Sequence, residues 1–255
     1  MGAKLNYIIL GVSLAVGVVL RTFMLLFMIE PHSGFIKHQY ITPAVLVIVF
    51  IIIAAALVFF TALNHKGNLK FSALPLVKAI SGIIMALAIF YEAFASSLLK
   101  YATPTQNLLH KAAAVLSVAA FLYMAYCYFA KINCKKPVVV APIVFWITRV
   151  ITVFTEFASL ATVSDSVIET ATMCLCLIVF LNSAKMECEL EIKAGLNRAV
   201  ALLCGFTGLV SALPRIICSI ITPTAFGYFS NIPPFTSLAA AIFAVVFALS
   251  IQTEE

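Results

Sequence analysis

The chain has very little charge for its length. Only 10% of its 255 residues are Asp, Glu, Lys or Arg, whereas 64% are hydrophobic. Soluble domains carry about 25% charged residues, because their surface must be covered by groups that water solvates. The composition therefore excludes an ordinary soluble protein and predicts a surface that faces mostly lipid.

The sequence also lacks the motifs of many enzymes and metal proteins. It contains no His-Glu-x-x-His, Gly-x-Ser-x-Gly, phosphate-binding Gly-x-x-x-x-Gly-Lys or Cys-x-x-Cys. The net charge is +6, but the basic residues are dispersed, so nothing indicates nucleic-acid binding. All four histidines fall in or beside expected loops: His32, His38, His65 and His110. We therefore expect no catalytic residue, no cofactor and no metal site.

Long apolar runs are what the chain does have. A membrane-spanning helix needs roughly 20 apolar residues, and open strand edges cannot lie in hydrocarbon. The sequence thus predicts an all-α polytopic transmembrane helix bundle, with residues 1–255 as one integral membrane domain. Eight spans are expected, at about 5–29, 41–63, 73–99, 108–130, 137–161, 165–187, 194–221 and 232–251.

The lysines of the loops predict the orientation. Cytoplasmic loops of membrane proteins are enriched in Lys and Arg. If the N-terminus is inside, the inner loops hold eight lysines and the outer loops three (Lys37, Lys100 and Lys111). The eight are Lys4, Lys66, Lys70, Lys131, Lys135, Lys136, Lys185 and Lys193. The distribution predicts both termini inside, in a plasma or cytoplasmic membrane, with the lipid bilayer as main partner.

Four odd-numbered spans carry an ionisable residue within the apolar run: Arg21, Glu92, Arg149 and Arg215. A charge at that depth costs at least about 2.5–3.5 kcal/mol, so it normally faces the interior of the bundle. Spans 2 and 8 are apolar almost throughout, which suits lipid contact on most faces. We therefore expect odd-numbered helices inside and even-numbered helices outside, apart from span 6, which carries Glu169.

Span 5 gives the clearest pattern. Arg149, Thr152 and Glu156 follow at steps of three and four and so share one helical face, with Trp146 expected beside Arg149.

Six buried charges make up the candidate site: Arg21, Glu92, Arg149, Glu156, Glu169 and Arg215. Three positive and three negative charges sum to zero. Such a site suits a small zwitterion or anion bound to arginine, with a glutamate exchanging a proton.

Two functions fit this pattern. The first is a transporter, a permease-like carrier of a small polar or charged solute, because charge near the midplane marks transport pathways. The alternative is a non-catalytic membrane subunit or sensor in which the same charges are a structural network. In the alternative, the alternating charges of 185–193 would contact a cytosolic partner protein.

Overall fold

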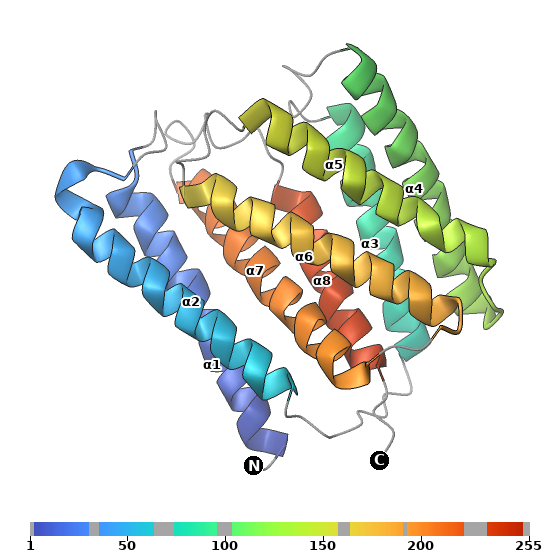
Figure 1. Ribbon diagram of the computed structural model, residues 1–255, viewed down its shortest axis with the longest axis horizontal. Coiled ribbons are helices and arrows are strands. Elements are labelled where there is room, and N and C mark those ends of the chain that lie inside the picture. The colour runs from blue at the N-terminus through green and yellow to red at the C-terminus, as the bar shows by residue number, and fades with distance from the viewer. Residues whose placement is uncertain are drawn as a thin grey trace.

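The computed structural model shows a bundle of long helices (Figure 1). It describes residues 3–30, 36–63, 74–95, 104–157, 164–190, 193–221 and 234–251. Within these ranges every regular element is a helix, and the only extended pairing is an isolated bridge between Ile29 and Ile36. The all-helical class predicted from the apolar runs is therefore confirmed.

The helix bounds lie close to the predicted ones, because Pro, Gly, Asn and Ser interrupt the apolar runs where helices end. Among the described residues, seven helices are long and apolar enough to cross a membrane, and the last is shorter, at 17 residues. The elements are α1 (Ala3–Phe23, continued by the π-turn Met24–Met28), the 3-10 turn His38–Tyr40, α2 (Ile41–Leu63), α3 (Leu74–Ala95), α4 (Pro104–Ala130), the 3-10 turn Lys136–Val140, α5 (Ala141–Phe157), α6 (Ser164–Glu187), α7 (Ala194–Ile221) and α8 (Pro234–Ser250).

Helices α7 and α8 form the centre of the bundle (Figure 1). The α1–α2 pair packs against α7, the α3–α4 pair reaches α8 through α3, and α5 and α6 lie across the front. Two glycines let α7 and α8 approach closely. A Cβ atom on Gly205 would lie 2.6 Å from Val245 Cγ2, and one on Gly208 would lie 2.8 Å from Ala241 Cβ. Small residues therefore set the central contact, as is common between membrane helices.

The expected inner ring of odd-numbered helices is wrong. Helix α8 is central and buries Ala240, Ala244 and Phe247, while α1 exposes Val16 and Val19. Helix α2 behaves as expected, with one buried stripe and exposed apolar side chains elsewhere. The cause of the error is physical: an aliphatic face packs equally well against acyl chains or against another helix, so hydropathy alone cannot rank helices by burial.

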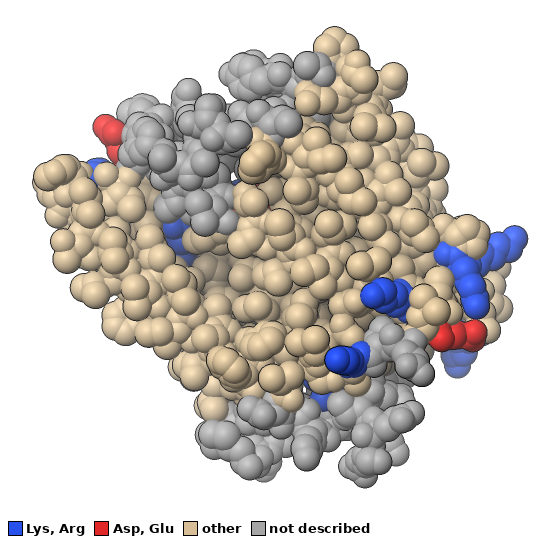
Figure 2. All heavy atoms as spheres, in the orientation of Figure 1, with Lys and Arg blue, Asp and Glu red and all other residues tan. Residues whose placement is uncertain are grey.

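Exposed lysines gather at one end of the bundle. Figure 2 shows Lys and Arg side chains concentrated where α4 and α6 end. The exposed lysines of this region, among the described residues, are Lys131, Lys135, Lys136, Lys185 and Lys193. Helices α1, α3 and α7 begin at this same end (Figure 1). We call it the basic end and the other the opposite end.

Candidate functional site

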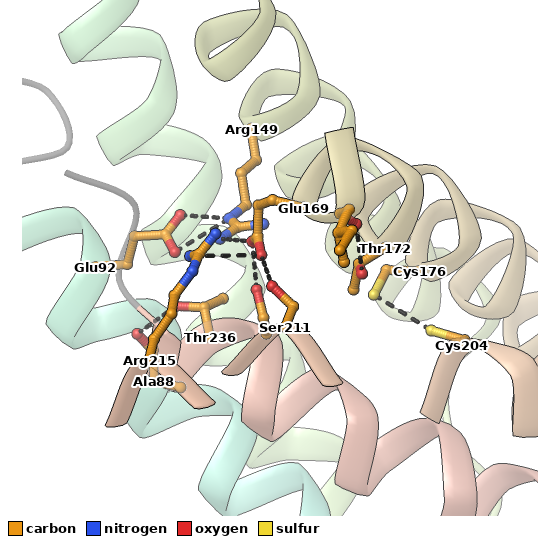
Figure 3. A network of polar contacts seen from close by, with 12 residues as sticks. Ala88, Glu92, Arg149, Glu169, Thr172, Cys176, Cys204, Ser211, Arg215 and Thr236 are labelled. Atoms are coloured by element: carbon orange, nitrogen blue, oxygen red, sulfur yellow. Dashed lines mark hydrogen bonds and ion pairs between the residues drawn. The ribbon is translucent and has the colours of Figure 1, made fainter. Parts of the chain in front are cut away.

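Four buried charges from four helices meet toward the opposite end of the bundle (Figure 3). They are Glu92 on α3, Arg149 on α5, Glu169 on α6 and Arg215 on α7, and each is at most 6% exposed. The first and last lie near the ends of their helices, whereas Glu169 lies in the second turn of α6. We call these four residues the charge cluster.

Arg149 joins the two carboxylates of the cluster. Its Nε donates to Glu92 Oε1 at 2.8 Å and to Oε2 at 3.1 Å, and its Nη2 donates to Glu169 Oε1 at 3.2 Å. Arg215 Nη1 lies 3.7 Å from Glu169 Oε2. Two positive and two negative side chains sum to zero, which is the condition under which charges tolerate burial together.

Two hydroxyl groups also donate hydrogen bonds to the Glu169 carboxylate. Ser211 Oγ on α7 donates to Glu169 Oε2 at 2.7 Å, and Ser237 Oγ on α8 donates to Oε1. Ser237 can reach the carboxylate because α8 lies against Gly208 of α7, where a Cβ would come within 3.0 Å of the Ser237 carbonyl oxygen. The close packing of α7 and α8 therefore also positions the cluster.

Several buried polar atoms beside the cluster have no hydrogen-bond partner among the described residues. These are Arg149 Nη1, Trp146 Nε1, both ring nitrogens of His110 and Asn107 Oδ1. The Arg149 guanidinium lies 5.0 Å from the Trp146 ring centroid, and His110 Nε2 lies 3.7 Å from Glu92 Oε1. An unpaired buried polar group costs about 1–3 kcal/mol and is rare in native structures. Three of these side chains carry N–H donors, so the site is chemically suited to a ligand with acceptor oxygens.

The structure unites four of the six predicted site residues. Arg21 is equally buried but lies on α1, where its Nη1 donates to Met24 Sδ at 3.2 Å. The side chain of Glu156 lies outside the part of the chain that the structure describes. The expected neighbourhood of Trp146 and Arg149 is confirmed.

Sequence reasoning missed His110. It was expected in or beside a loop, but α4 begins at Pro104, so His110 falls in the second turn and is fully buried. Proline is favoured in the first turn of a helix, and Pro104 was therefore a readable signal for this earlier start. From His110, steps of four and three lead to buried Ala114 and Ser117, which places all three on the inward face.

An aromatic layer separates the charge cluster from the basic end. Phe180 stacks on Trp146 at 5.6 Å and on Phe243 at 4.9 Å, and Phe121 meets both Phe180 and Phe243 edge-on. Along α6, Phe180 lies between Glu169 and Glu187. The bundle interior is therefore polar near the opposite end and aromatic in the middle.

A second polar group lies beyond the aromatic layer. Tyr128 Oη donates to Glu187 Oε1 at 2.8 Å, and Lys78 Nζ lies 5.4 Å from the Tyr128 ring centroid. These three side chains line a small cavity together with Ser81, Ser183 and apolar residues of α8. Polar groups thus occur on both sides of the aromatic layer, within α3, α4 and α6.

Within the described residues, no three His, Cys, Asp or Glu side chains are grouped as metal ligands. Cys176 and Cys204 are free thiols whose Sγ atoms lie 3.4 Å apart. Comparison with protein-family models, with curated proteins and with solved structures found no match for this chain.

Proposed function

We propose that the protein is a membrane carrier of a small polar or charged solute, bound at the charge cluster. In this proposal α8 is the eighth span, since 17 residues cover about 26 Å at 1.5 Å per residue. Both termini are cytoplasmic, because the basic end collects the exposed lysines. The plasma or cytoplasmic membrane is the proposed location.

One observation carries this proposal. N–H groups of Arg149 and Trp146 lie fully buried, with no hydrogen-bond partner among the described residues, beside a network whose charges sum to zero. A network whose only role is structural gains nothing from leaving such donors unpaired, because each adds a desolvation cost. A binding site gains from them, because they remain available for the solute.

The rest of the geometry fits alternating access. Without solute, the carboxylates of Glu92 and Glu169 occupy the arginines and act as internal counterions. An anionic group of the solute replaces a glutamate on Arg149, so the charged side chains exchange partners without being exposed to lipid. The aromatic layer is the barrier on the basic side, and the Lys78–Tyr128–Glu187 group is the polar region that a solute meets after crossing it.

The test is an uptake screen in proteoliposomes with small anions, zwitterions and cations. It compares wild type with the double variant Arg149→Met/Glu92→Leu, which removes a buried pair together and so spares the fold. Uptake of at least one solute by wild type and its loss in a folded double variant are expected. The matched control is Lys136→Met/Glu189→Leu, which removes an exposed pair 3.6 Å apart and leaves uptake unchanged. Absence of uptake of every solute class, or equal uptake by the double variant, contradicts the proposal.

The second candidate is a non-catalytic membrane subunit or sensor that uses the cluster as an internal brace. The observation in its favour is the direct contact between Arg149 and both glutamates. A brace predicts that Arg149 substitutions change stability only, and that no solute protects the protein against unfolding. The uptake screen and the same set of solutes in a thermal-unfolding assay therefore separate the two functions.

A further inference from the structure

We infer that His110 is a proton-binding site that couples the binding of a small monocarboxylate on Arg149 to the uptake of one proton. This inference rests on the proposed carrier function and names its solute class. His110 is fully buried, and neither ring nitrogen has a hydrogen-bond partner among the described residues. An imidazole is the side chain whose charge changes most readily near neutral pH.

The coupling follows from one shared oxygen. Glu92 Oε1 accepts the 2.8 Å hydrogen bond from Arg149 Nε and also lies 3.7 Å from His110 Nε2. A proton on His110 turns this second approach into an ion pair and draws the Glu92 carboxylate away from Arg149. The Nε edge of the guanidinium then joins Nη1, which has no partner among the described residues, as a binding site for an anion.

The class of anion follows from the carboxylate that Arg149 binds in the structure. Its Nε donates to both oxygens of a carboxylate, so a solute carboxylate is the closest chemical replacement for Glu92. The Trp146 and Phe145 rings, which are both fully buried, suit an apolar remainder on the solute.

Charge balance fixes the stoichiometry. The cluster alone sums to zero, with Arg149 and Arg215 positive and Glu92 and Glu169 negative. A monocarboxylate adds one negative charge and the proton on His110 adds one positive charge, so the loaded site is neutral again. Burial of an unbalanced charge at this depth is strongly unfavourable, which makes proton and anion bind together.

The ionisable groups that face His110 are few. Glu92 approaches from α3 and Arg149 from α5, and no other charged side chain of the helices that pack on α4 interacts with it in the described residues. On α4 itself, Lys111 is adjacent in sequence and half-buried. Burial of the imidazole opposes its protonation most strongly, Glu92 favours it and Arg149 opposes it, so moving Glu92 toward His110 and away from Arg149 strengthens proton binding.

The experiment uses the purified full chain in detergent and its single tryptophan, Trp146, as an intrinsic fluorescent reporter at the site. Acetate is titrated between about pH 7 and about pH 9, where acetate is ionised and a free imidazole is mostly neutral. One proton bound per anion predicts that acetate affinity falls about tenfold per pH unit. The variant His110→Gln is expected to lose this pH dependence, and His38→Gln, at an exposed site, to keep it.

Proton uptake is measured on the wild type with an indicator dye in weak buffer, which needs no variant to fold. One proton taken up per acetate bound is expected. An acetate affinity that is independent of pH in wild type, or the same pH dependence in His110→Gln, overturns the inference and leaves the carrier proposal standing. Preference for glycine or chloride over acetate overturns the solute class. Failure of uptake in proteoliposomes, with acetate binding and proton uptake intact, overturns carrier function alone.

Discussion

Replacement of Arg149 by methionine should destabilise the protein by about 3–5 kcal/mol. Arg149 makes two separate charged interactions, one with Glu92 and one with Glu169. Hydrogen bonds to charged groups contribute about 1.5–3 kcal/mol each, which gives about 3–6 kcal/mol for two. This range agrees with the about 3–5 kcal/mol measured when one partner of a buried ion pair is removed.

The two carboxylates should respond differently to the loss of Arg149. Glu169 keeps Arg215, Ser211 and Ser237 as partners, whereas Glu92 loses both hydrogen bonds from Arg149 Nε. A second substitution, Glu92→Leu, removes the carboxylate and should restore stability to within about 1–2 kcal/mol of wild type. The coupling energy between the two sites should then be at least about 2 kcal/mol.

The assay is unfolding in mixed micelles followed by circular dichroism, so that Trp146 beside the mutated site is not the probe. The control pairs Arg149→Met with Glu30→Leu, because Glu30 is exposed and lies two residues after the π-turn that follows α1. This control pair should stay as unstable as the single variant. The reasoning fails if Arg149→Met costs less than about 1 kcal/mol, or if Glu30→Leu restores stability as well as Glu92→Leu does.

Two further predictions concern packing and orientation. Gly208→Ala should lower the free energy of unfolding by about 1–3 kcal/mol in the same assay, because its Cβ would lie 2.8 Å from Ala241 Cβ. Gly11→Ala, whose Cβ would have nothing within 4 Å, should be neutral or slightly stabilising. Equal effects of the two substitutions would contradict the close α7–α8 contact. The proposed orientation places Cys188 on the cytoplasmic side. A variant with Cys188 as its only cysteine should therefore react with a membrane-impermeant maleimide only after the cells are permeabilised. Labelling of intact cells would show that the orientation is the opposite one. A Cys134-only variant should react more slowly than the Cys188-only variant, because burial and the neighbouring Glu187 raise the pKa of the Cys134 thiol, so that less thiolate forms near pH 8.

Sequence alone determined the helices and which charges needed partners. Predicted spans 41–63 and 194–221 coincide with α2 and α7, because long apolar runs bounded by turn residues leave few other ways to satisfy the backbone in lipid. Arg149 contacts both Glu92 and Glu169 directly. This pairing could be expected from the sequence, because a charge buried in an apolar bundle needs a partner of opposite sign.

Tertiary structure decided which helices are central and which polar atoms of the described residues have no hydrogen-bond partner. The apolar residues of α8 suit lipid and protein neighbours equally, so only the fit of Ala241 and Val245 against the glycines of α7 places α8 in the centre. Likewise, the inward position of His110 depends on where α4 starts and on how α3 and α5 pack against it. Hydrophobicity and charge act through the solvent and can be read along the chain, whereas close packing and hydrogen-bond geometry depend on neighbours that are distant in sequence.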